Sequence, residues 1–187
     1  MKSSVIFSKV IFSTLLIATF FSCSENFGDI TFTEESQEAI VMGSGGGLLD
    51  MLPTNNLLPP LRLEIDLQEE LDSQNAGPAK AVYLDALSLT ITPTAMPEGD
   101  TDNFDFIDKV DVFVESTKSG STLSKKQVAV LENVPENQST VDFTVIEDVD
   151  LKPYIEEGVR LTTSGSGEVP PDDTSFKAIV TIRAELL

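Results

Sequence analysis

The sequence lacks histidine and tryptophan altogether and has a single cysteine in 187 residues. Without histidine, the chain has no imidazole to act as a general base, to activate a serine or cysteine nucleophile, or to ligate zinc or copper. Without tryptophan, its aromatic surfaces are two tyrosines and eleven phenylalanines, which argues against a stacking platform for sugar rings. One cysteine excludes a disulfide within the chain, so the hydrophobic core alone must hold the fold.

Basic residues are also scarce. Twelve Lys and Arg stand against 31 Asp and Glu, and the formal net charge is −19 at pH 7. The few basic residues are scattered, whereas nucleic-acid binding requires a cluster of them to displace counterions. The same negative charge opposes binding to anionic lipid headgroups. We therefore expect no nucleic-acid partner, and an acidic surface that gives solubility and attracts cations or basic proteins.

One long apolar run is present, at residues 10–21. Lys2 and Lys9 precede it without any acidic residue, and polar residues follow it directly after Cys23. A secretory signal needs roughly 7–15 apolar residues, whereas a membrane-spanning helix needs about 20. The run therefore fits a signal peptide and is too short for a spanning helix.

The run ends in the sequence FFSC at residues 20–23, which resembles the lipobox of bacterial lipoproteins, with Phe20 at a position that is usually leucine. The resemblance implies that residues 1–22 are removed and that Cys23 is acylated, so that a lipid anchor at Cys23 makes the membrane a partner. Ser24 resembles the residue found in lipoproteins sent to an outer membrane, which implies an outer-membrane location facing the periplasm or the cell surface. Two alternatives stay open: an ordinary secretory signal with an incidental cysteine, and an uncleaved anchor.

We predict three parts: a lipoprotein signal peptide at residues 1–22, a lipidated N-terminus with a flexible tether at 23–60, and a β-sandwich domain at 61–187. The tether prediction rests on the glycine-rich residues 43–47 and on the proline-punctuated leucines at 48–60. These leucines form either an exposed docking patch or a loop packed on the edge of the domain. The second interpretation is favoured, because large exposed leucine patches are uncommon without a partner.

From residue 61 the apolar residues recur with a period of two, which is typical of half-buried strands. Turn-forming clusters separate the strands, and no long helical segment intervenes. The expected fold is all-β: an antiparallel Greek-key sandwich of the immunoglobulin-like kind with about seven or eight strands, and a closed barrel as second choice. The strands are expected at residues 61–68, 82–92, 110–115, 127–134, 141–145, 159–163 and 176–186, with one more short strand at 29–33.

One short helix is expected at residues 150–157. Asp150 is placed to cap its N-terminus, Pro153 fits the first turn, and Gly158 is placed to end it.

The acidic loop at residues 98–108 is the strongest candidate for a site. Its carboxylates at Asp100, Asp102, Asp105 and Asp108 are hard oxygen ligands of the kind that calcium prefers. The spacing lacks the glycine and the closing glutamate of an EF-hand loop. The alternative is a solvated turn in which the loop's phenylalanines anchor it in the core.

Other groups of residues are weaker candidates for a functional site. Ser121 and Ser124 lie beside two lysines, which is a loose serine–lysine arrangement and a better match for a polar hairpin turn. Tyr154 with Lys152 is placed for a ligand contact, although a tyrosine packed at a sandwich corner is more common. With 31 acidic residues, paired carboxylates for glycoside hydrolysis are expected by chance.

These observations favour a lipid-anchored, extracytoplasmic protein of the cell envelope that is not an enzyme and has no cofactor unless calcium binds. Its role would be structural or binding, with an unidentified protein or glycan as partner. A carrier of an apolar ligand or lipid in a barrel or sandwich cavity is the second hypothesis, and a carboxylate-dependent hydrolase is the third.

Overall fold

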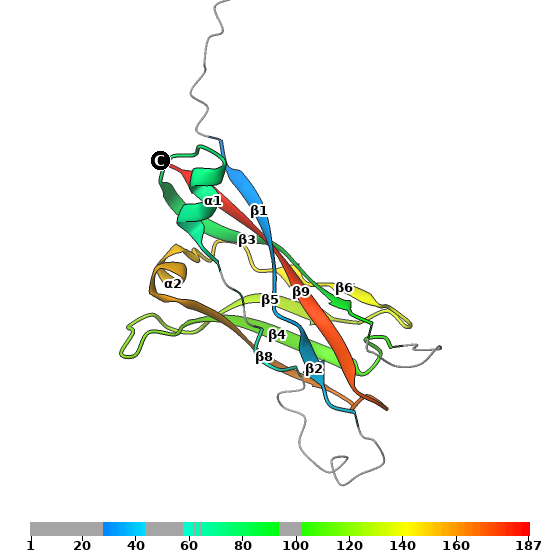
Figure 1. Ribbon diagram of the computed structural model, residues 1–187. Coiled ribbons are helices and arrows are strands. Elements are labelled where there is room, and N and C mark those ends of the chain that lie inside the picture. Colours follow the sequence, from blue (N-terminus) through cyan, green and yellow to red (C-terminus); the bar gives the residue numbers. More distant parts are fainter. Residues whose placement is uncertain (1–27, 44–57, 62, 64, 94–101) are drawn as a thin grey trace, which may run out of the picture.

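The computed structural model describes residues 28–43, 58–61, 63, 65–93 and 102–187. Two antiparallel sheets lie over one another, and two short helices sit together near one end of them (Figure 1). The prediction of an all-β antiparallel sandwich is confirmed.

The first sheet has the strand order β1–β9–β3–β6. Its long central strands are β3 (Ala79–Ile91) and β9 (Thr174–Leu186), while β1 (Ile30–Glu35) and β6 (Thr140–Asp142) flank them. The short strand β2 (Ala39–Val41) also pairs with β9, further along the edge that holds β1. The alternation predicted for β9 is confirmed, because every second residue from Phe176 to Ala184 is buried.

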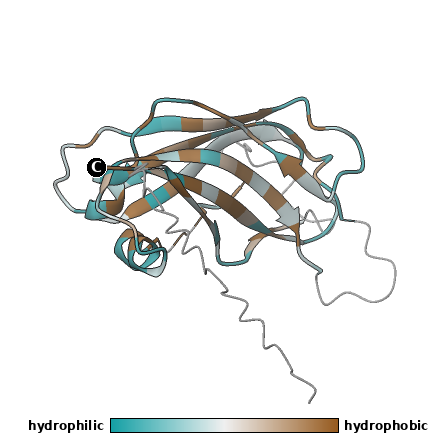
Figure 2. Ribbon diagram, turned by 90° about the horizontal axis from the view of Figure 1, so that it is seen from above, coloured by the Kyte–Doolittle hydropathy of each residue, from teal (hydrophilic) through white to brown (hydrophobic). Residues whose placement is uncertain are grey.

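The second sheet has the order β7–β5–β4–β8. It consists of β4 (Ile107–Ser116), β5 (Lys126–Glu132), β7 (Thr144–Val145) and β8 (Val159–Gly167). Val110, Val112 and Val114 on β4 are almost fully buried and face the first sheet, as their spacing predicts. Figure 2 shows the same alternation of apolar and polar residues along the strands.

Two short strands that follow one another in the chain, β6 and β7, belong to different sheets. β6 pairs with β3 in the first sheet, and two residues later β7 pairs with β5 in the second. Buried Phe143 sits between them, and its amide donates to the carbonyl of Leu87 over 2.9 Å. In the described part of the chain the two sheets do not close further into a barrel, so the second-choice fold is not the one adopted.

The strand predicted at residues 61–68 is wrong. Leu61 makes only an isolated bridge to Leu161, and the chain then enters helix α1 (Leu67–Ser73). The side chain of Asp66 accepts a hydrogen bond from the amide of Glu69 over 3.0 Å and so caps this helix. Leu61 and Leu63, whose spacing suggested a strand, are nevertheless buried in the core, and Leu71 is the buried residue of the helix.

The helix predicted at residues 150–157 is confirmed as α2 (Lys152–Glu157). Its N-cap is Leu151, and the carboxylate of Asp150 accepts from the amides of Lys152 and Val82, both over 3.0 Å. Gly158 ends the helix with a φ of 88°, a left-handed conformation that favours glycine.

Part of the segment predicted as a tether belongs to the sheet. β1 and β2 occupy residues 30–41, pair with β9 throughout, and bury Phe32 and Val41 in the core. Leu58 is also buried, and its carbonyl accepts a hydrogen bond from the hydroxyl of Thr163 over 2.7 Å. The leucine at 58 therefore packs on the domain, whereas those at 48–57 lie outside the described residues.

No helix among the described residues is long and apolar enough to cross a membrane.

Candidate functional site

Two of the predicted site residues, Cys23 and Asp100, lie outside the described residues. Three others are described: Asp102, which is half-buried, and the exposed Asp105 and Asp108. In the described ranges, no three His, Cys, Asp or Glu side chains come together in a group that would hold a metal ion. Calcium binding by this loop therefore stays a prediction.

The carboxylate of Asp105 already has a structural partner. Its Oδ1 accepts from the amide of Asn137 over 2.6 Å, and its own amide donates to the side chain of Asn103 over 2.9 Å. Phe104 and Phe106 on either side are buried in the core. These contacts match the alternative interpretation of the loop, a turn held down by its phenylalanines.

A carboxylate on α2 bonds to two serines and a lysine at the end of β4 and in the loop that follows it. Glu157 at the end of α2 accepts from the hydroxyl of Ser121 over 2.6 Å and from that of Ser116 over 2.9 Å, and it pairs with Lys118 over 3.1 Å. These donors, Ser121 first, hold the pKa of Glu157 below its ordinary value. The loop is thereby tied to the helix, and Lys125 instead lies over the ring of Phe113 at 4.5 Å from its centroid.

Tyr154 is packed rather than exposed for a ligand. It is buried, and its hydroxyl donates to the carbonyl of Ser124 over 2.6 Å. Burial raises the pKa of its hydroxyl. Lys152 is half-buried and donates to the carbonyl of Ala79 over 2.8 Å. The interpretation of Tyr154 as a corner residue fits these contacts.

A hollow of about 440 Å³ lies beside β3. The segment 143–151 is bonded to β3 at its two ends. At one end the amide of Phe143 donates to the carbonyl of Leu87, and at the other the amide of Leu151 donates to the carbonyl of Val82 over 2.7 Å. Between these two points β3 carries a β-bulge at Asp85, where its register against β9 shifts. The residues that carry polar groups into the lining are Tyr83, Asp85, Asp142, Glu147, Asp148 and Arg183.

Arg183 is the basic residue of this hollow, and neighbouring acids hold it in place. Its Nε pairs with Asp85 over 3.0 Å and its Nη1 with Asp29 over 3.1 Å. The guanidinium lies 4.9 Å from the centroid of the Tyr83 ring, a cation–π arrangement. Hydrogen bonding to Asp85 is the main reason that the pKa of Arg183 is raised. The hollow thus offers carboxylate acceptors and a tyrosine side chain to hydroxyl or amine donors.

A second hollow, about 410 Å³, lies between the two helices. Its apolar walls come from Ile65, Leu67, Leu71, Pro78, Ala79 and Ile155. Its rim carries Asp66, Gln68, Lys152 and Glu156, of which Lys152 and Glu156 are paired over 3.8 Å. We call this hollow the interhelix groove.

Neither hollow was predicted from the sequence. The acids beside β3 and Arg183 were not identified there as site residues. Asp66 followed by Glu69 and Glu70 was the available signal for α1, since acidic residues favour the first turn of a helix. No known protein-family model matches the chain, and the comparison with curated proteins gave no match either.

Proposed function

We propose that this protein is a lipid-anchored, extracytoplasmic protein of the cell envelope that acts by binding or as a structural element, without catalysis. The observation that carries the proposal is Cys23. It is the sole cysteine, and it follows a 12-residue apolar run that is itself preceded by two lysines. The resemblance to bacterial lipoproteins implies acylation there and an outer-membrane location. Each buried methylene contributes about 0.8 kcal/mol, so two or three acyl chains give stable attachment whereas one is marginal.

The described side chains support a role without catalysis. The hydroxyls of Ser116 and Ser121 bond to Glu157, and the hydroxyl of Tyr154 bonds to a carbonyl. These groups are engaged in holding loops and a helix together. The hollow beside β3 has acceptors and an aromatic edge, a combination that suits a polar protein or glycan partner better than a reaction.

A carrier of an apolar ligand is the second candidate. The space between the sheets is filled by buried side chains such as Val82, Leu89 and Ile182. The observation in favour of this candidate is the interhelix groove, which has apolar walls and opens at the surface.

The test is incorporation of an alkyne-bearing fatty acid in a bacterium that makes lipoproteins, comparing the full chain with Cys23→Ala and with Ser22→Ala as a matched control. We expect label on the wild-type chain and on Ser22→Ala, and none on Cys23→Ala. Membrane flotation and protease digestion of intact and lysed cells then locate the domain. Equal labelling of the Cys23→Ala variant, or a wild-type chain that is secreted without label, would overturn the proposal.

A further inference from the structure

The end of the sandwich at which β1 begins contains the interhelix groove. Seven residue steps separate Cys23 from Ile30, where β1 begins, so the two lie at most about 25 Å apart. Ile30 pairs with Ala184, and two residues further along β9 Leu186 pairs with Ala79, a wall of the groove. The side chain of Gln74, just after α1, reaches the carbonyl of Thr31. The groove therefore lies beside the start of β1.

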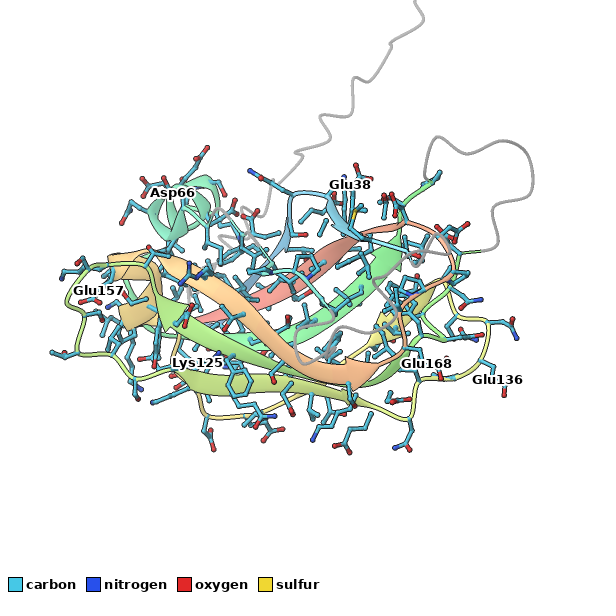
Figure 3. The ribbon with its side chains drawn as sticks, turned by 90° about the horizontal axis from the view of Figure 1, so that it is seen from below. Glu38, Asp66, Lys125, Glu136, Glu157 and Glu168 are labelled. Carbon is cyan, nitrogen blue, oxygen red and sulfur yellow. The ribbon has the colours of Figure 1, made fainter. Side chains whose placement is uncertain are left out.

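The opposite end of the sandwich is remote from this point. Ile40 on β2 pairs with Ser175, nine residues along β9 from Ala184, which corresponds to about 30 Å of extended strand. Figure 3 shows Asp66 and Glu157 of the helical end on one side of the molecule and Glu136 and Glu168 on the other. A lipid on Cys23 therefore brings the helical end, and not the β2 end, towards the membrane.

The groove end presents apolar surface for contact with lipid. Leu187 is 64 % exposed, and its amide donates to the carbonyl of Pro78, a wall of the groove. Ile65, Leu67 and Ile155 are only partly buried, so the groove is not covered by the rest of the described chain. The stem of Lys152 lines one side, while its ammonium is held by Ala79 and Glu156.

The charge at this end selects the kind of lipid. Asp66 and Glu156 lie on the rim, and Glu34, Glu69 and Glu70 are close by. Burial, together with the charges of Glu70 and Glu69, raises the pKa of Glu34, which reports a concentration of negative charge. Anionic headgroups would be repelled here, whereas zwitterionic lipids would not.

We propose that the helical end of the sandwich faces the bilayer and that the interhelix groove receives an acyl chain of a zwitterionic membrane lipid. This inference rests on the proposed function, since the anchor at Cys23 sets the orientation. It assigns the groove a partner, the acyl region of the membrane that carries the anchor.

The absence of tryptophan makes the test direct, because any introduced tryptophan is the only one. Leu67→Trp and Ile155→Trp place a reporter in the groove, while Ile40→Trp and Met42→Trp place one at the remote end, where the native side chains are 51 % and 62 % exposed. The chain from residue 23 keeps every described strand and helix, and its sole cysteine is coupled to a maleimide lipid in phosphatidylcholine vesicles. Circular dichroism and thermal unfolding check that each variant is folded.

We expect phosphatidylcholine brominated on its acyl chains to quench the groove reporters, with a shift of their emission to shorter wavelength, and to leave the remote reporters unchanged. Adding phosphatidylglycerol should reduce the quenching. Unquenched groove reporters on anchored, folded protein would overturn the inference, as would equal quenching at both ends. Because coupling at Cys23 is chemical, this result is independent of whether cells acylate Cys23, and the labelling experiment above decides that question separately.

Discussion

Tyr154 on α2 donates a 2.6 Å hydrogen bond to the carbonyl oxygen of Ser124, 30 positions earlier in the loop before β5. The tyrosine is only 2 % exposed, so this bond fixes the loop between β4 and β5 against a helix that follows much later in the chain. Three residues further along α2, Glu157 receives the bonds from Ser116, Ser121 and Lys118. The end of α2 thus organises the β4–β5 loop.

Replacing Tyr154 by phenylalanine should destabilise the fold by about 1–2 kcal/mol, because the carbonyl of Ser124 loses its donor while the ring still fills its site. Chemical denaturation of the two proteins at pH 7 gives the difference in the free energy of unfolding. Tyr83→Phe is the control. Its ring is half-exposed beside Arg183, and that substitution should change stability by less than about 0.5 kcal/mol. Equal stability of Tyr154→Phe and wild type would contradict the assigned role.

Gly158→Ala should destabilise the protein by at least about 1 kcal/mol. Gly158 has a φ of 88°, and an added Cβ would collide with the hydroxyl of Thr117. Gly77→Ala is the matched control, because no atom lies within 4 Å of the Cβ that this change adds. Thermal unfolding of both variants is the measurement, and a Gly158→Ala protein as stable as Gly77→Ala would disprove the prediction.

Removal of the cap on α1 should lower the free energy of unfolding by about 1 kcal/mol. In Asp66→Ala the amide of Glu69 loses its acceptor, which frays a helix of only seven residues. Asp66→Asn should retain most of the stability, since asparagine caps helices well. Hydrogen exchange across residues 67–73 and denaturant unfolding report the effect. Identical protection in Asp66→Ala and wild type would show that the cap is dispensable.

The bonds to Glu157 predict a pH dependence of stability. Ser121, then Lys118 and Ser116, hold the folded-state pKa of Glu157 below its ordinary value of 4.5. A lowered folded pKa means that this contribution is complete above the unfolded pKa and is lost as the pH falls through the folded pKa. Glu157→Gln should therefore be less stable than wild type at pH 7, and the difference should shrink as the pH falls below the ordinary value of 4.5.

Unfolding by urea at several pH values measures this difference, with Glu136→Gln, at an exposed residue of the opposite end, as the control. If the difference in the free energy of unfolding between Glu157→Gln and wild type stays constant with pH, the carboxylate is not the titrating group.

The strands and their buried faces were predictable where the period of two is uninterrupted. The valines of β4 and the alternating residues of β9 are buried as their spacing predicts. The prediction was less successful at bulges. On β5 both Val128 and Ala129 are buried, opposite a register shift between Val112 and Phe113, and on β3 the shift at Asp85 changes which residues face the core. A bulge depends on the partner strand, so the alternation within one strand does not report it.

The candidate sites divide in a similar way. The acidic loop could be located from its composition, and so could its anchoring phenylalanines. The hollow beside β3 could not be predicted, because it brings Asp85 and Arg183 together from positions 98 apart and depends on where the chain leaves β3. The interhelix groove could not be predicted either, because α1 forms one of its walls. The leucine spacing at 61–67 predicted a strand where the chain leads into this helix.

The sequence by itself determined that the chain forms an all-β antiparallel fold and ends its strands at clusters of turn residues, because side-chain periodicity and turn chemistry are local properties. Only the tertiary structure decided that β1 and β2 join the edge of β9, that the neighbouring strands β6 and β7 pair in different sheets, and that the two hollows form. Each of these features depends on which distant strand is available for pairing and on how the sheets pack, and that information lies in contacts between residues far apart in the chain.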